Sequence, residues 1–318
     1  MRHAVAWSSH SPFILRAAPA TTAISRLPKG IMPLAGRLHP MGIGAWTAST
    51  LEGVLILLPP SEGKTAHASG DPFEMSALSF PQLGEARGEV LAALRTVSAA
   101  EDAMQVLGVG ASLAEEVARN ITLHREPAAQ AHDVYSGVLF EALGYSTLDA
   151  AAQRRADESI VVVSALWGAV GFADRIPPYR LSMGVKLEPV GKLASWWKKR
   201  LTPVLDARAG DQLIVDARSS TYAAAYKPSN GNSVAVNVFQ LRNGTPKVVS
   251  HFAKHTRGEV ARFLVEQETE PANAQELLDL ANTRWDATLS EDKKGLALNI
   301  VLAEDHQFTS PAKAAAGV

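Results

Sequence analysis

The stretch SIVVVSALWGAVGFADRIPPYRLSMG, residues 159–184, decides the fold that we predict for this chain. It begins with four consecutive β-branched residues, 160–163, a run that is typical of a strand buried on both faces. Gly168 and Gly171 interrupt the run, because glycine lets the backbone turn or approach another group closely. Two prolines then stiffen the chain in front of Arg180. This order predicts polar groups at the edge of a cleft, although an ordinary loop with a surface arginine has the same pattern.

The composition excludes several classes of protein. The 318 residues are 47% hydrophobic and 20% charged, which is typical of a globular protein with a sizeable core. The net charge of −1 gives no general attraction to nucleic acid or to anionic membranes. The absence of cysteine excludes disulfides, thiolate-bound iron–sulfur clusters and cysteine zinc sites, and it suits a reducing cytoplasm. No apolar run reaches the roughly 18 residues that a membrane span needs.

The two ends of the chain differ from its middle. Residues 1–50 contain no Asp or Glu, are rich in Ala, Pro, Gly, Ser and Thr, and have no helical or strand periodicity. We expect a disordered extension there, or a start codon that was assigned too early. Residues 51–303 are predicted to form a single compact domain, and residues 304–318 a disordered tail.

A second apolar run, residues 54–58, predicts another buried strand, followed by two prolines and Ser61-Glu62-Gly63-Lys64-Thr65. The Gly-Lys-Thr ending is similar to that of a phosphate-binding loop with the pattern G-x-x-x-x-G-K-[ST]. Leu58 occupies the first glycine position, and the prolines lack the N–H groups that would bind phosphates. A nucleoside triphosphate site is therefore not favoured. Lys64 remains a candidate cation at the carboxyl end of a strand.

The remaining patterns predict a mixed α/β fold in which helices surround a buried mixed sheet. We expect helices at residues 82–98, 191–207, 253–266 and 273–281, and strands at 212–217, 233–239, 247–252 and 296–302. Ser219 and Tyr222 follow one of these strands, so they are further candidates for the cleft. Trp196 and Trp197 stand beside three basic residues, a cluster that favours helix packing over nucleic-acid stacking.

Residues 98–123 predict two helices joined by Gly108-Val109-Gly110. This is the pattern of a helix-hairpin-helix element, in which the N–H groups of the hairpin and the second helix bind a DNA phosphate. An ordinary pair of antiparallel helices is the alternative. Glu115 and Glu116 favour it, because two carboxylates in the first turn of the second helix would repel a phosphate.

The helix expected at residues 253–266 places Lys254, Arg257 and, less directly, Arg262 on one face. A group of cations in a chain of slightly negative net charge predicts an anionic ligand. His251 and His255 have the spacing of metal ligands, but the sequence offers no obvious third ligand. We therefore expect neither a metal nor a cofactor.

Five motifs resemble those of the YaaA peroxide-stress protein family: LLPPSEGK, DVYSG, SALWG, PYRLSMG and FAKHTRG, between residues 57 and 258. The resemblance implies a cytosolic α/β protein with a positively charged cleft, a helix-hairpin-helix element, DNA binding and a role in limiting iron-dependent damage during peroxide stress. By position, it implies a cleft formed by Ser61, Glu62, Lys64, Tyr135, Arg180, Ser219, Tyr222, Lys254, Arg257 and Arg262.

Two functions of different classes remain open. In the first, the protein binds DNA or a nucleotide-like anion without turnover, and its cations hold phosphate oxygens. In the second, it is an enzyme that acts on a nucleotide or a damaged base, with Lys64 or Lys254 as base or Schiff-base nucleophile. Both functions need the same cationic cleft. In either case we expect a cytoplasmic monomer.

Overall fold

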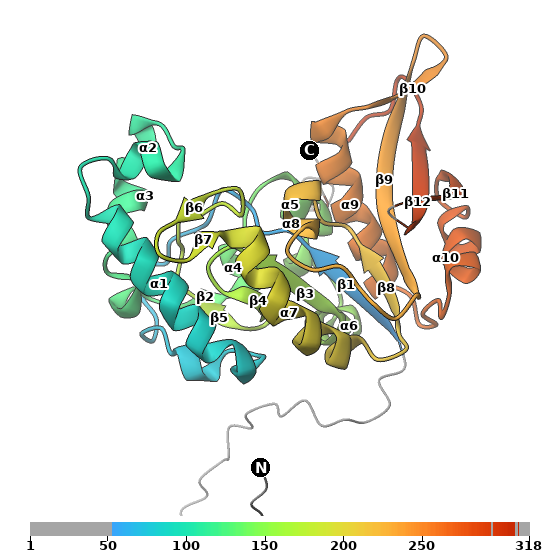
Figure 1. Ribbon diagram of the computed structural model, residues 1–318. Helices are drawn as coiled ribbons and strands as arrows, with labels where there is room; N and C mark the ends of the chain where they lie inside the picture. The colour runs from blue at the N-terminus through green and yellow to red at the C-terminus, as the bar shows by residue number, and fades with distance from the viewer. Residues whose placement is uncertain (1–52, 294, 309–310, 312–318) are drawn as a thin grey trace, which may run out of the picture. The chain divides into compact units, whose positions relative to one another are not determined.

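Two buried parallel strands lie at the centre of the fold, as the two apolar runs predict. The computed structural model describes residues 53–293, 295–308 and 311 (Figure 1), so the expectation for residues 1–50 lies outside the described part. Strand β1 (Val54–Leu58) pairs in parallel with β3 (Ile160–Ser164), and every residue of both strands is buried. Continuous β-branched and aliphatic runs form these strands because both of their faces are covered.

The sheet extends from this pair in the order β11-β12-β9-β8-β1-β3-β4, with β10 paired to β9. The pairs β1–β8, β8–β9 and β9–β12 are parallel, whereas β4, β10 and β11 run antiparallel to their neighbours. The mixed α/β class is therefore confirmed. The bounds are β4 Gly168–Gly171, β8 Leu213–Asp216, β9 Ser233–Arg242, β10 Thr245–Val248, β11 Asp286–Asp292 and β12 Gly295–Leu302.

Helices contact the sheet along its length: α6 lies against β1, α7 against β4, α9 against β9 and α10 against β11. In the view of Figure 1, α7 lies in front of the central strands. Within the described residues, every helix is too short or too polar to traverse a lipid bilayer. The helices are α1 Gly84–Ser98, α2 Ala103–Leu107, α3 Ala114–Arg119, α4 Ala131–Val134, α5 Val138–Leu143, α6 Ala150–Ser159, α7 Leu193–Ala209, α8 Ser220–Ala223, α9 Ser250–Val265 and α10 Ala274–Ala281.

Two short antiparallel pairs lie outside the main sheet: β2 (Ala129–Gln130) with β5 (Arg175–Ile176), and β6 (Lys186–Leu187) with β7 (Gly191–Lys192). The strand predicted at residues 247–252 is wrong over most of its length. β10 ends at Val248, and α9 begins at Ser250, three residues before the predicted start of that helix.

Two motif glycines are required by close packing. At Gly168 the backbone has φ +73°, and a Cβ atom would lie 2.5 Å from the ring of Trp197. Trp197 is fully buried and donates a hydrogen bond of 2.8 Å to the carbonyl of Ala165, so it packs the core as predicted. At Gly258 of α9, a Cβ atom would lie within 3.0 Å of the carbonyl oxygen of Leu139 in α5. A side chain at either position would force packed elements apart.

Part of the segment predicted as a disordered tail is described by the structure. The ring of Phe308 lies 4.6 Å from the ring of Phe252 and 4.2 Å from that of His255, both on α9. The side chain of Gln240 donates to the carbonyl of Glu304 over 3.2 Å. Residues 304–308 are therefore held against α9 and β9, while residues 309–310 and 312–318 lie outside the described part.

Candidate functional site

The candidate site lies where three parallel strands end. β1 lies between β3 and β8, with Leu57 opposite both Val161 and Asp216, so the three carboxyl ends meet at one edge of the sheet. Loops that follow this edge are where α/β proteins usually bind ligands. The loop after β1 contains Lys64, and Ser164 ends β3.

Backbone pairing between two motifs positions Lys64. Lys64 and Tyr135 form an isolated antiparallel bridge. The N–H of Thr65 donates to the carbonyl of Val134 over 2.8 Å, and the N–H of Ser136 donates to that of Gly63 over 3.4 Å. The loop of the LLPPSEGK motif is thereby held against the DVYSG motif, although more than 60 residues separate the two in the sequence.

The ammonium group of Lys64 is enclosed, although other parts of the residue reach solvent. Its Nζ atom lies 4.3 Å from the ring centroid of Tyr179 and 5.6 Å from that of Tyr135, and it donates to the carbonyl of Ser61 over 2.7 Å. Burial is the main cause that lowers the pKa of Lys64 to about 7. The carboxylate of Glu62 opposes this shift, and the charge of Arg180 adds to it. Near neutral pH, the neutral amine and the ammonium are therefore both populated.

The two tyrosines that contact Lys64 belong to a row of hydrogen-bonded hydroxyl groups. The hydroxyls of Tyr135 and Tyr179 are 3.2 Å apart, and that of Tyr179 is 2.7 Å from the hydroxyl of Ser164. Ser164 also accepts a hydrogen bond of 3.0 Å from the N–H of Trp167. Burial raises the pKa of Tyr135 and of Tyr179 well above the usual value for a phenol. Both rings therefore stay uncharged, so they enclose Lys64 without neutralising it.

Arg180 is buried and already paired. Its Nε donates to Glu116 of α3 over 2.9 Å, its Nη2 contacts the same carboxylate oxygen, and its Nη1 lies 3.1 Å from Glu62. The side chain of Asn120 holds the main chain of Arg180 by two hydrogen bonds of 2.9 Å. Its amide oxygen accepts from the N–H of Arg180, and its amide nitrogen donates to the carbonyl of Arg180. The carboxylate of Glu116, which we expected to repel a phosphate at the hairpin, instead forms part of the site.

Tyr222 completes the group of residues at this edge. It is buried, and among the described residues its hydroxyl proton has no acceptor of good geometry, although the N–H of Met183 and the side chain of Ser182 lie beside its oxygen. Burial is the largest cause that raises the pKa of Tyr222 to about 12, followed by the charge of Glu62, whereas hydrogen bonding to Met183 and Ser182 and the charge of Arg180 lower it. Tyr222 thus shares its charged neighbours with Lys64. We call Lys64, Tyr135, Tyr179, Arg180 and Tyr222 the Lys64 cluster.

The other predicted site residues lie around the Lys64 cluster or away from it. Ser219 is half-buried and is the N-cap residue that precedes α8, where its carbonyl accepts the N–H of Tyr222 over 3.0 Å. Arg257 donates to the carbonyl of Val236 in β9 over 3.0 and 3.1 Å. Burial lowers the pKa of Arg257, and the carboxylate of Asp216 opposes that shift. Lys254 is exposed on α9.

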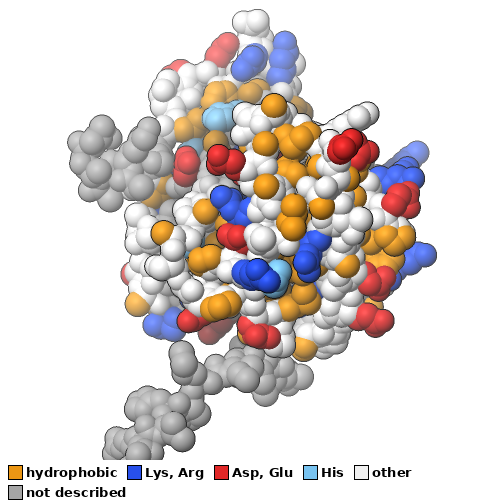
Figure 2. Space-filling view, turned by 90° about the vertical axis from the view of Figure 1, so that its left-hand side faces the viewer, with side chains coloured by type: hydrophobic (Ala, Val, Ile, Leu, Met, Phe, Trp, Pro, Cys, Tyr) orange, Lys and Arg blue, Asp and Glu red, His pale blue; other side chains and the backbone are white. Residues whose placement is uncertain are grey.

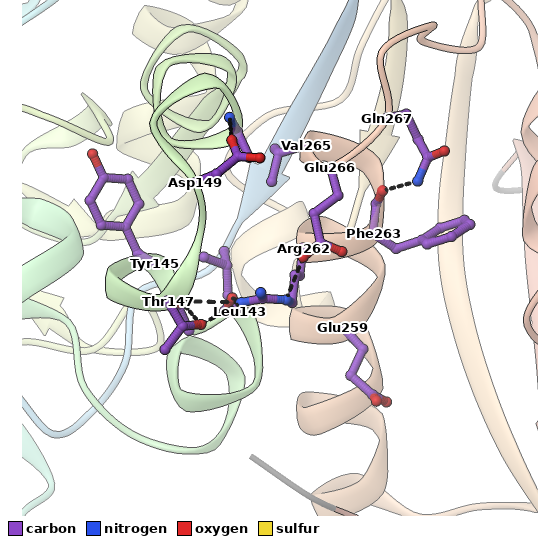
Figure 3. Close-up of polar contacts among 12 residues, drawn as sticks. Leu143, Tyr145, Thr147, Asp149, Glu259, Arg262, Phe263, Val265, Glu266 and Gln267 are labelled. Carbon is purple, nitrogen blue, oxygen red and sulfur yellow. Dashed lines mark hydrogen bonds and ion pairs between the residues drawn. The ribbon is translucent and has the colours of Figure 1, made fainter. Parts of the chain in front are cut away.

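Arg262 belongs to a different network, between α9 and α5 (Figure 3). Its Nη1 donates to the carbonyls of Leu143 and Gly144 and to the hydroxyl of Thr147, over 2.9, 3.2 and 2.8 Å. Its Nε lies 2.8 Å from Glu266, one turn along the same helix. These bonds satisfy carbonyls at the end of α5, so the structure gives Arg262 a role in packing and does not bring it to the Lys64 cluster.

The hairpin at residues 108–110 differs from the predicted phosphate-binding element. The N–H of Gly108 donates to Gln105 and that of Val109 to Met104, so both close the end of α2. The flanking helices α2 and α3 have five and six residues. The detail of a helix-hairpin-helix element is therefore not confirmed, since two of the three N–H groups that would bind phosphate are already used.

Basic and acidic side chains are intermixed on the face shown in Figure 2 rather than gathered in one basic surface. That face is the side on which α2 and α3 lie in Figure 1. Glu116 and Asn120 were not predicted as partners of Arg180 from the sequence. A pairing across 60 or more residues leaves no local pattern, and the only signal was a carboxylate pair in the first turn of a predicted helix.

Comparisons with known proteins agree with the five motifs. The family model described as peroxide stress protein YaaA matches residues 54–288. The UPF0246 protein SCO2297 of Streptomyces coelicolor is 42% identical over 260 residues, which cover 80% of this chain and 100% of that protein. The UPF0246 protein CE1889 of Corynebacterium efficiens is 42% identical over 230 residues, 72% of this chain and 91% of that protein. The UPF0246 protein Rsph17029_0026 of Cereibacter sphaeroides is 31% identical over 255 residues, 77% and 99% of the two chains. This chain is therefore a member of the YaaA peroxide stress protein family.

Proposed function

We propose that the protein binds a nucleotide-like anion, either free or within DNA, at the Lys64 cluster, and that this binding limits oxidative damage during peroxide stress. The family description supports the link to peroxide stress. The observation that carries the binding proposal is the incomplete hydrogen bonding of the Lys64 cluster. A lysine ammonium has three donors, and toward the described residues Lys64 uses one of them, on the carbonyl of Ser61.

The Tyr222 hydroxyl adds a second buried donor, whose proton has no acceptor of good geometry among the described residues because its neighbour Met183 offers an N–H. Burying a polar group without a partner costs about 1–3 kcal/mol, so a ligand oxygen that accepts from this hydroxyl would recover that cost. A phosphate oxygen or a nucleobase carbonyl, each of which accepts hydrogen bonds, suits donors of this kind.

The charges favour a small or single-stranded ligand over a long duplex. Glu62 and Glu116 already pair with Arg180, and the N–H groups of Gly108 and Val109 are already used. Duplex binding draws its strength from many unpaired cations along a surface, because each neutralised phosphate releases counterions. A single nucleotide needs only the few donors of the Lys64 cluster, so we favour a nucleotide or an unpaired end of DNA as the ligand.

The test is the affinity for a fluorescently labelled single-stranded oligonucleotide and for a mononucleotide, measured by anisotropy and calorimetry at low salt. Lys64→Ala and Tyr222→Phe should each weaken binding by about tenfold or more, since hydrogen bonds to charged groups contribute about 1.5–3 kcal/mol. Lys293→Ala is the matched control. Lys293 is exposed in the turn between β11 and β12, and β9 and β8 separate these two strands from β1 in the sheet. Folded Lys64→Ala and Tyr222→Phe variants that bind as tightly as the unsubstituted protein would refute the proposal.

A further inference from the structure

The surroundings of Lys64 suit a nucleophile better than a simple anion-binding cation. A lysine that only binds anions gains from exposure, because its ammonium is then fully charged and free to move. Lys64 instead lies against Tyr179 and Tyr135, with Nζ fixed by a hydrogen bond of 2.7 Å to Ser61. Its pKa of about 7 makes the neutral amine abundant near neutral pH. Enclosure of this kind is how proteins activate a lysine for attack on a carbonyl group.

We propose that Lys64 forms a Schiff base with an aldehyde carried by a nucleotide-like anion, such as the ring-opened sugar of an abasic site. This inference rests on the proposed function, since the aldehyde has to reach the Lys64 cluster as part of a bound ligand. Lys254, the other candidate nucleophile from the sequence, is instead exposed on α9.

The reaction needs no oxidant or reductant. The lone pair of neutral Nζ attacks the aldehyde carbon, and the π pair of the carbonyl moves to its oxygen. The oxygen gains one proton and the nitrogen loses one, which gives a neutral carbinolamine. The nitrogen lone pair then expels the hydroxyl group, which leaves as water with one further proton, and a protonated C=N bond remains.

Two groups of the site can move these protons. The carboxylate of Glu62 acts on the charges of both Lys64 and Tyr222, and it can accept the proton that the attacking nitrogen loses. The Tyr222 hydroxyl, whose pKa is about 12, is protonated at neutral pH and can donate to the leaving hydroxyl. Tyr135 and Tyr179 hold the amine in place and keep water from it.

The experiment uses two single-stranded oligonucleotides that differ only at one position, an abasic site with its aldehyde or a tetrahydrofuran analogue without one. The full chain is incubated with each and treated with sodium borohydride, which converts a Schiff base into a stable secondary amine. We expect a covalent adduct with the abasic oligonucleotide alone, heavier than the protein by the oligonucleotide mass less one oxygen atom. Peptide mapping should place it on Lys64, and the yield should rise with pH through about 7.

Lys64→Arg keeps a positive charge but cannot form the adduct, so the yield should fall at least tenfold, whereas Lys293→Arg should leave it unchanged. Thermal unfolding of each variant checks that it is folded. Binding of both oligonucleotides without any adduct would overturn the Schiff base and leave the proposed function intact. An adduct on another lysine, or one that persists in Lys64→Arg, would also overturn it. Binding of neither oligonucleotide would overturn the Schiff base, and binding of neither these nor a mononucleotide would overturn both proposals.

Discussion

Replacing Gly258 by alanine tests the contact between α9 and α5. In the middle of an ordinary helix, alanine is more stable than glycine by about 0.5–1 kcal/mol. At Gly258 the new methyl would lie within 3.0 Å of the Leu139 carbonyl oxygen and 2.9 Å from the Cβ of Ala142. Neither neighbour can rotate away, because one is backbone and the other is the first atom of its side chain. The two helices would therefore have to separate.

Overpacking of a core usually costs about 1–3 kcal/mol, and a clash with backbone belongs at the upper end of that range. After subtraction of the helix-propensity gain, we expect Gly258→Ala to lower the free energy of unfolding by about 2 kcal/mol. Gly88→Ala is the matched control, because Gly88 lies in α1 and a Cβ atom there meets nothing within 4 Å. That variant should gain about 0.5–1 kcal/mol.

Urea unfolding followed by circular dichroism measures both variants on the same scale. Equal slopes against urea would show that each substitution changes stability and not the surface exposed on unfolding. A Gly258→Ala protein that is as stable as the unsubstituted chain, beside a stabilised Gly88→Ala protein, would refute the close approach of α9 to α5.

Two further predictions concern Lys64 and Arg262. Because burial lowers the pKa of Lys64 from 10.5 to about 7, the unfolded chain binds more protons between these values, so the contribution of Lys64 to stability rises with pH across that window. Lys64→Met should therefore raise the melting temperature most at pH 7 and below, with a smaller gain towards pH 10.5; a gain that does not change with pH would contradict the lowered pKa. Arg262→Ala should lower the unfolding free energy by about 1.5–3 kcal/mol and leave ligand affinity within twofold, while exposed Lys254→Ala should change stability by less than about 0.5 kcal/mol. Weaker binding by Arg262→Ala at unchanged stability would return this residue to the ligand site.

Much of the fold could be predicted from local patterns. The run at residues 160–163 became β3, the run at 54–58 became β1, and the helix expected at residues 273–281 became α10, with Asn273 as its N-cap. These elements are long runs or clear periodicities whose burial the sequence itself encodes. β11 was missed because its residues are mostly exposed and polar, so its pairing with β12 leaves little hydrophobic alternation.

The candidate site was only partly predictable, because its charges are set by contacts between distant segments. Position at the carboxyl end of a strand indicated Lys64, and the stiff proline turn indicated Arg180. Neither pattern could show that Glu116 neutralises Arg180 or that Tyr179 encloses Lys64. The cations expected to share one face of α9 do not form a single group, for the same reason. Lys254 is exposed, whereas the end of α5 provides carbonyls for Arg262.

The pairing of Arg180 with Glu62 and Glu116 means that the protein supplies its own counterions at the site. A phosphate that reaches this guanidinium has to exchange with a carboxylate of the same chain, and no salt ion is released in that step. On duplex DNA, the logarithm of the affinity falls with the logarithm of the salt concentration by a slope of about 0.9 for each phosphate neutralised. The number of phosphate contacts calculated from this slope would then be smaller than the number actually made. Because Glu116 belongs to α3, the same exchange would leave α3 without its ion pair to Arg180. Ligand occupancy and the stability of the hairpin would thereby be thermodynamically linked.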